Sequence, residues 1–262
     1  MNASHLVDTH CHILPGIDDG AKSMEMSIAM ARMALKAGVG TIVATPHRIK
    51  GTYDNSFELI NKKVNELNKQ LKKKKIPITI LFGAENYSEI DVDFSFVINH
   101  KNYFLLEFPV DSYSPFFNDI ITDALKKKVI PIIAHPERNI DIRENPKIVE
   151  GLINDGCLMQ LDAHSFFEQD KDIKDYALFL LKNNAYHLIA SDSHTPHGYE
   201  KFSKALTIVK KRVQPEKFTE LTLTIPGKII KGEKYVPEKI TFVEKPHTRF
   251  GFRVLARKFF HI

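Results

Sequence analysis

Short apolar segments alternate along the chain with helical patterns, and this alternation restricts the fold more than any other feature. Seven segments are predicted as strands, and several of them are apolar without the polar alternation of a half-exposed strand: residues 6–9, 41–45, 78–82, 103–106, 130–134, 157–161 and 187–190. Such strands are typical of parallel sheets whose faces are covered by helices. The length of 262 residues lies within the range of one (β/α) barrel. The sequence therefore predicts a single α/β domain over residues 1–232.

The segments between the predicted strands carry apolar residues at helical spacing. Met24, Ile28 and Leu35 lie on one stripe, and Gly38 is placed to end that helix. After about Gly232 the alternation stops. We therefore expect residues 233–262 to form a basic, aromatic-containing C-terminal tail that is partly ordered.

Charge and cysteine content restrict the partners and the compartment. The chain has 37 Lys and Arg against 32 Asp and Glu, a net charge of +5 that mildly favours anionic partners. No basic–aromatic stripe or known nucleic-acid module accompanies this charge, so we expect no nucleic-acid partner. No apolar run reaches about 18 residues and no secretory signal precedes Asp8, so we expect no stable membrane insertion. Cys11 and Cys157 are too few for a disulfide framework, which favours a cytoplasmic location.

Metal-ligand side chains follow six of the seven predicted strands, at the ends where such folds place their sites. These residues are Asp8, His10, His12, His47, Glu85, Glu107, His135, Asp192 and His194. In an extended segment the two members of an i, i+2 pair point the same way, so His10 and His12 can share a metal ion. Imidazole and carboxylate together suit divalent ions such as Mn, Fe or Zn. The pattern predicts a site for more than one metal ion.

The two cysteines do not predict thiol chemistry. Cys11 lies between the paired histidines and should point to the opposite face, into the core. Neither cysteine has an arginine six residues later, so the phosphate loop of cysteine phosphatases is missing. No phosphate-binding P-loop, dinucleotide fingerprint or G-x-S-x-G elbow is present either.

Five motifs occur in order and together resemble a known superfamily. They are DTHCH at residues 8–12, DDG at 18–20, ATPH at 44–47, AHPER at 134–138 and SDSH at 191–194. This set resembles the polymerase and histidinol phosphatase (PHP) superfamily. Within it, HCHILPGIDDGA at residues 10–21 and HPERN at 135–139 are similar to the CpsB/CapC bacterial protein-tyrosine phosphatases. The resemblance covers roughly residues 6–232.

The resemblance implies a distorted seven-stranded (β/α) barrel with three divalent metal ions, of which manganese is usual and Fe, Zn, Co or Mg are alternatives. The ligands that it implies are His10, His12, Glu85 and Asp192 for the first ion, Glu85, Glu107 and His135 for the second, and Asp19, His47 and His194 for the third. Asp18 is the alternative to Asp19. Asp8 is expected to orient the histidines.

The resemblance also implies an activity. Family members hydrolyse phosphotyrosine on bacterial tyrosine kinases or their substrates and so regulate capsule or exopolysaccharide synthesis. Clustered divalent ions would activate a water molecule for attack on phosphorus. Arg138 is the first candidate to bind the phosphate, since guanidinium does so through two hydrogen bonds, and Arg48 is the second.

Several alternatives stay open. Arg138 could instead form a structural salt bridge with a nearby carboxylate. Histidinol phosphate or another small phosphoester could be the substrate on the same metal core, and a nuclease-type module is a further alternative. An oligomer is also possible.

Overall fold

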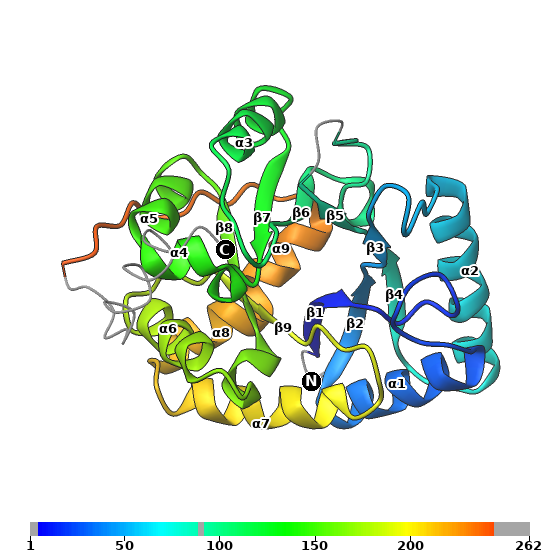
Figure 1. Cartoon of the computed structure of the whole chain (residues 1–262). Coiled ribbons are helices and arrows are strands. Elements are labelled where there is room, and N and C mark those ends of the chain that lie inside the picture. Colours follow the sequence, from blue (N-terminus) through cyan, green and yellow to red (C-terminus); the bar gives the residue numbers. More distant parts are fainter. Residues whose placement is uncertain (1–4, 89–91, 244–262) are drawn as a thin grey trace.

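The computed structural model describes residues 5–88 and 92–243, and its strands form two parallel sheets (Figure 1). The smaller sheet has the order β1-β2-β4 and contains β1 (Leu6–Cys11), β2 (Val39–Ala44) and β4 (Thr79–Phe82). The larger sheet contains, in spatial order, β3 (His47–Arg48), β5 (Glu85–Tyr87), β6 (Tyr103–Glu107), β7 (Ile130–Ala134), β8 (Leu158–Asp162) and β9 (Leu188–Ala190). All pairings within the two sheets are parallel, which confirms the predicted α/β class.

The hydrogen-bonded ladders differ from the predicted ring of seven strands. The described residues contain nine strands, because Thr45 and Pro46 separate β2 from β3 and two further residues separate β4 from β5. Proline has no N–H to donate to a ladder, which explains the first interruption. Near the end of β1, Cys11 and Ser193 form only an isolated parallel bridge. A closed seven-stranded barrel is therefore not confirmed.

Helices connect the strands and cover the sheets. Those of the described residues are α1 (Met24–Lys36), α2 (Phe57–Lys73), α3 (Phe116–Lys126), α4 (Ile140–Glu144), α5 (Lys147–Asn154), α6 (Lys171–Lys182), α7 (Gly198–Lys210), α8 (Pro215–Thr219) and α9 (Ile225–Lys231). Shorter helical turns are η1 (Ile98–His100), η2 (Pro136–Arg138), η3 (Ala163–Phe167) and η4 (Glu220–Thr224). No helix in the described ranges combines the length and apolar composition of a membrane span.

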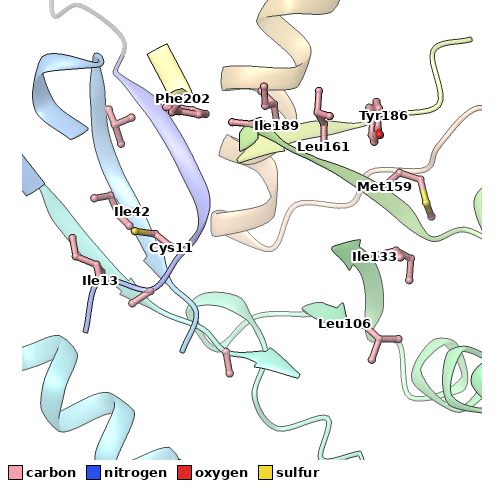
Figure 2. Close-up of a cluster of buried hydrophobic side chains, with 14 of the residues drawn as sticks. Cys11, Ile13, Ile42, Leu106, Ile133, Met159, Leu161, Tyr186, Ile189 and Phe202 are labelled. Atoms are coloured by element: carbon pink, nitrogen blue, oxygen red, sulfur yellow. The ribbon is translucent and has the colours of Figure 1, made fainter. Parts of the chain in front are cut away.

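Alternate residues of the strands enter two different apolar clusters, so both faces of the strands are buried. One face, called the outer face here, packs against the surrounding helices and includes Ile42, Leu106, Ile133 and Met159 (Figure 2). The other, called the inner face, packs against α9. Its members include Val43, Leu105, Ile132, Leu158 and Leu188 from the strands and Ile225 and Ile229 from α9. Burial on both faces is the physical reason for the continuous apolar runs in the sequence.

The described part of the predicted tail, residues 233–243, contacts the rest of the domain. The Tyr103 hydroxyl of β6 donates to the Glu233 carbonyl at 2.7 Å and accepts from the Tyr235 N–H at 3.0 Å. Further along, the Asn154 side chain bonds both the N–H and the carbonyl of Ile240. Residues 244–262, the remainder of that predicted tail, lie outside the described residues.

We expect Tyr103→Phe to lower the free energy of unfolding by about 1–2 kcal/mol, because it removes two hydrogen bonds to residues 233–235. Urea unfolding measures the change. Tyr113→Phe is the matched control, since that hydroxyl bonds the exposed Asn118 side chain. An equal loss in both variants would contradict the structural role of the Tyr103 hydroxyl.

Candidate metal centre

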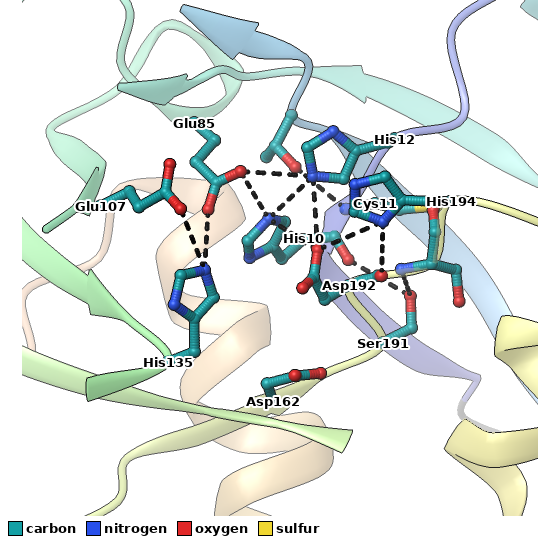
Figure 3. A network of polar contacts seen from close by, with 12 residues as sticks. His10, Cys11, His12, Glu85, Glu107, His135, Asp162, Ser191, Asp192 and His194 are labelled. Atoms are coloured by element: carbon teal, nitrogen blue, oxygen red, sulfur yellow. Dashed lines mark hydrogen bonds and ion pairs between the residues drawn. The ribbon is translucent and has the colours of Figure 1, made fainter. Parts of the chain in front are cut away.

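The ligand-type side chains lie on the inner face of the strands, beyond the apolar cluster. Side chains alternate along a strand, so the residue two positions after an inner-face residue also faces inward. Leu105 belongs to the inner apolar cluster and Glu107, two residues later, faces the polar cluster. Figure 3 shows these side chains converging from different strands and from the loop after β9.

Glu85, at the start of β5, is the carboxylate that contacts the most histidines. Its Oε2 atom lies 3.2 Å from His10 Nε2, 3.3 Å from His12 Nε2 and 3.0 Å from His47 Nδ1. Its Oε1 atom lies 3.1 Å from His135 Nε2 (Figure 3). Burial alone would raise the pKa of Glu85, but His10 and the other imidazoles lower it well below its usual value. Glu85 is therefore a buried anion compensated by imidazoles.

Asp192 supplies a second buried carboxylate to the same histidines. Its Oδ1 atom lies 3.3 Å from both His10 Nε2 and His12 Nε2, and 3.7 Å from His194 Nδ1. This oxygen is buried and makes no hydrogen bond within the described residues. A buried acceptor surrounded by imidazole nitrogens is suited to a shared cation.

Asp19 and Asp18 have different surroundings. Asp19 Oδ1 lies 3.3 Å from His194 Nε2 and 3.6 Å from His47 Nε2. The hydrogen bond with His194 is the main cause that lowers the pKa of Asp19 to about 2. Asp18 is buried and its Oδ2 atom accepts from His12 Nδ1 at 2.8 Å. Asp19 thus belongs to the cluster of ligand-type atoms, whereas Asp18 orients the His12 ring through a hydrogen bond.

Four groups of ligand atoms result, and the atoms of each group lie within 4.8 Å of one another. The groups are His12, Asp19, His47 and His194; His10, His12 and Asp192; His10, Glu85 and His135; and His47, Glu85 and Glu107. All nine residues that the resemblance implies as ligands are thereby brought together, and Asp8 is in none of the four groups.

The donor atoms fit a metal rather than a hydrogen-bond network alone. When His10 Nδ1 donates to Gln160 and His12 Nδ1 donates to Asp18, both Nε2 atoms present lone pairs to each other. These two atoms are only 3.2 Å apart, so a positive charge is needed between or beside them. Burial lowers the pKa of His10, but Glu85 and Asp192 raise it to about 9 overall. A divalent cation supplies the charge that these carboxylates attract.

Asp8 accepts most of its hydrogen bonds from the loop after β9 and from α7. Its carboxylate accepts from the Ser191 hydroxyl at 2.6 Å and N–H at 3.0 Å, and from the Tyr199 hydroxyl at 2.7 Å. Among the described histidines it bonds the N–H of His10, at 3.4 Å. The ring nitrogens of His10 and His12 bond Gln160 and Asp18. Asp8 therefore fixes the start of the loop that carries Asp192 and His194.

The two candidate arginines have different contacts. The Arg138 guanidinium contacts the carboxylates of Asp162 and Asp192, the latter at 3.0 Å. Burial lowers the pKa of Arg138, but these carboxylates raise it above its usual value. Arg48 instead lies over the Phe96 ring, 3.5 Å from its centroid, and donates to Asn86. Alternation along β3 explains this, since His47 already faces the cluster.

Two ligand positions have an unusual backbone. His135 has a φ of 31° and Asp192 a φ of 46°, both in the left-handed region that residues with a Cβ atom adopt at a cost. His135 directly follows the end of β7, and Asp192 is the second residue after the end of β9, so both lie where the chain turns. Strain of this kind is commonly found at functional sites.

Neither cysteine is placed for nucleophilic attack. Cys11 is buried in the outer-face cluster, as its position between the paired histidines predicts, and accepts from the Tyr199 hydroxyl. Burial raises the pKa of both Cys11 and Cys157 above the usual value for a thiol. Both thiols therefore stay protonated near neutral pH.

Comparison with known families gives the decisive observation. The family described as "Capsular polysaccharide synthesis, CpsB/CapC" matches residues 6–231. The chain belongs to the CpsB/CapC family. This membership confirms the resemblance that the motifs carried.

Individual CpsB/CapC proteins are similar over most of their length. The chain is 39% identical over 196 residues to the tyrosine-protein phosphatase YwqE from Bacillus subtilis, covering 72% of this chain and 77% of YwqE. It is 30% identical over 238 residues to the tyrosine-protein phosphatase CpsB from Streptococcus pneumoniae, covering 86% and 98%. A crystal structure from work that describes YwqE and CpsB as unique metal-dependent tyrosine phosphatases matches with a TM-score of 0.83 and 32% identity. It covers 91% of this chain and 99% of that one.

We expect His135→Ala to lower the bound metal content and to reduce phosphatase activity at least about 100-fold, because ligand replacement weakens a metal site. Elemental analysis and a hydrolysis assay measure the two effects. His197→Ala, which removes an exposed histidine outside the cluster, should change neither. Full activity of His135→Ala, or of the wild type after exhaustive chelation, would refute a metal-dependent reaction.

Cys157→Ala should keep most of the phosphatase activity, and so should Cys11→Ala, because both thiols are buried and protonated. Steady-state kinetics with a small aryl phosphate are sufficient to measure this. Complete loss of activity in either variant, with metal content unchanged, would indicate cysteine catalysis instead.

Proposed function

We propose that this chain is a metal-dependent protein-tyrosine phosphatase that removes phosphate from phosphotyrosine in proteins. The observation that carries the proposal is the inner-face cluster of imidazoles and carboxylates in a chain of the CpsB/CapC family. The names of YwqE and CpsB as tyrosine-protein phosphatases support the substrate class. The capsule-synthesis description of the family supports a role in regulating capsular or exopolysaccharide synthesis, with a bacterial tyrosine kinase as the phosphoprotein partner.

We further propose that the centre holds three divalent ions, most readily manganese. Such ions lower the pKa of a water molecule and neutralise charge on the phosphoryl oxygens. The chain supplies a mixed set of imidazole and carboxylate donors, which suits Mn and does not exclude Fe, Zn, Co or Mg. Gln160 and Asp18 keep His10 and His12 in the tautomer that presents Nε2 to the cluster.

Arg138 is the residue that we propose to bind the phosphate. Its contacts with Asp162 and Asp192 use Nη2, and within the described residues Nε and Nη1 have no hydrogen-bonded acceptor. The side chain is 26% exposed, so these donors can reach an anion. A guanidinium binds two phosphate oxygens at once, which would orient the group beside the cluster. Arg48 stays the second candidate: it lies over Phe96 and lines the cavity that contains Tyr53.

The surroundings of His47 support an aromatic substrate. The Tyr53 ring stacks on the His47 ring, with centroids 5.7 Å apart and planes at 15°. Tyr53 also lines a cavity of about 270 Å³, whose other lining residues are Ile49, Tyr87 and Val92 and the polar or charged Arg48, Lys50, Asp54, Asn86 and Asp93. The rings of Tyr53 and Tyr87 can pack against a tyrosine ring, which the short side chain of phosphoserine lacks. A phenolate is also a better leaving group than an alkoxide.

We expect the metal-loaded protein to hydrolyse phosphotyrosine peptides at least about tenfold faster, in kcat/KM, than phosphoserine peptides or histidinol phosphate, which corresponds to about 1.4 kcal/mol in the barrier. Parallel assays in manganese measure the ratio. If histidinol phosphate has the highest kcat/KM, the metabolic alternative replaces the protein-phosphatase proposal. Hydrolysis of none of the three would point to another phosphoester class, the nuclease-type reaction included.

A further inference from the structure

Asp162, at the end of β8, lies directly behind the arginine that we assign to the phosphate. Its Oδ2 atom accepts from Arg138 Nη2, and the same nitrogen lies 3.0 Å from Asp192 Oδ2. Asp192 belongs to the metal cluster, but Asp162 is in none of the four ligand groups. Asp162 therefore acts on the guanidinium and not on the metal ions.

Asp162 is itself held firmly. It is 1% exposed, and its Oδ1 atom accepts from the His164 N–H at 2.8 Å. Its own N–H donates to Glu137 Oε1 at 3.0 Å. Because Glu137 immediately precedes Arg138 in the chain, the backbone turn that carries the arginine is joined to the backbone of its carboxylate partner.

Glu137 strengthens this junction with two hydroxyl groups. Ser165 donates to Oε1 at 2.8 Å and Tyr186 donates to Oε2 at 2.9 Å, so a buried carboxylate is fully hydrogen-bonded. Burial raises the pKa of Glu137, with the nearby Asp162 carboxylate adding to the effect. The turn after β7 and the turn after β8 are thus fixed to each other at several points.

We propose that Asp162 is a positioning residue for phosphate binding. By holding Arg138 at Nη2, it keeps Nε and Nη1 directed to the space beside the cluster and prevents the guanidinium from pairing with Asp192 alone. Preorganisation of this kind improves affinity because the arginine loses less conformational freedom when the anion binds. The inference rests on the proposed role of Arg138 in binding phosphate.

The sign of the effect separates positioning from simple electrostatics. Asp162 is an anion close to a site for an anion, so by Coulomb's law its neutralisation alone would tighten phosphate binding. Loss of positioning would weaken binding instead. Asp162→Asn keeps an acceptor for the His164 N–H while it removes the ion pair with Arg138.

We expect Asp162→Asn to weaken the binding of inorganic phosphate to the metal-loaded protein about tenfold, which is typical of residues that orient a functional group. Isothermal titration calorimetry measures this dissociation constant, and metal content should stay unchanged. For a small aryl phosphate, KM should rise by a similar factor while kcat changes less than about threefold. Unchanged or tighter phosphate binding would overturn the proposal.

Two further variants make the test specific. Arg138→Lys should weaken phosphate binding, and adding Asp162→Asn to it should cause little further loss, because both act through one guanidinium. Additive losses would overturn the proposal. Asp162→Glu, which keeps the charge but displaces it, should also weaken binding and covers the case in which the Asn variant does not fold. Wild-type affinity in Asp162→Glu would overturn the proposal.

Asp123→Asn is the matched control, since it makes the same change of side chain at an exposed ion pair with Lys126, away from the guanidinium. Its phosphate affinity should equal that of the wild type, and an equal loss there would overturn the proposal. The binding assay does not depend on which phosphoester is hydrolysed. Failure of the tyrosine-phosphatase proposal would therefore appear in the peptide assays alone, and failure of the positioning role in the calorimetry alone.

Discussion

The structure depends on the compensation of one buried charge, that of Glu85. A carboxylate removed from water is unfavourable unless other groups supply matching charge or hydrogen bonds. Here four imidazoles provide the match, those of His10, His12, His47 and His135. The first two come from β1 in the smaller sheet or directly after it, and the other two from β3 and the end of β7 in the larger sheet. The polar cluster is consequently also the place where the two sheets are connected.

Two-sided burial of the strands makes this cluster possible. Along the inner face, apolar residues pack against α9, and the polar residues begin only near the strand ends. The apolar layer excludes water from one side of the cluster and strengthens the electrostatic interactions within it. The other side can admit a substrate, since Arg138 and His194 are partly exposed there. The polar cluster thus has an apolar layer on one side and an accessible side opposite to it, because side chains alternate between the two faces of short parallel strands.

The sequence predicted which ligand-type side chains lie together, because a single rule applies to nearly all of them. Side chains that follow apolar strands in a parallel α/β fold converge at one edge, whatever the details of strand pairing. The same rule would have found Asp162, which directly follows the predicted strand 157–161, and alternation would have placed Gln160 on the inner face. Alternation along β3 would also have turned Arg48 away from the cluster.

Other features required coordinates. Apolar runs do not reveal where the hydrogen bonds between two strands stop. The sequence therefore did not separate β3 from the end of β2, and the predicted ring of seven strands is not confirmed. The choice between Asp18 and Asp19 depends on a 2.8 Å contact with His12 that no local pattern encodes. Asp8 accepts hydrogen bonds from Ser191 and Tyr199, which are more than 180 residues away in sequence.

The left-handed backbone at His135 and Asp192 restricts how the thermal stability of such a protein can be increased. A residue with a Cβ atom held there costs of the order of 1 kcal/mol or more, and glycine would relieve much of that cost. Selection for thermal resilience alone would therefore favour replacements that discard ligand atoms. At these two positions a gain in thermal stability would remove a ligand side chain. A more heat-resistant enzyme therefore has to gain its stability elsewhere in the chain.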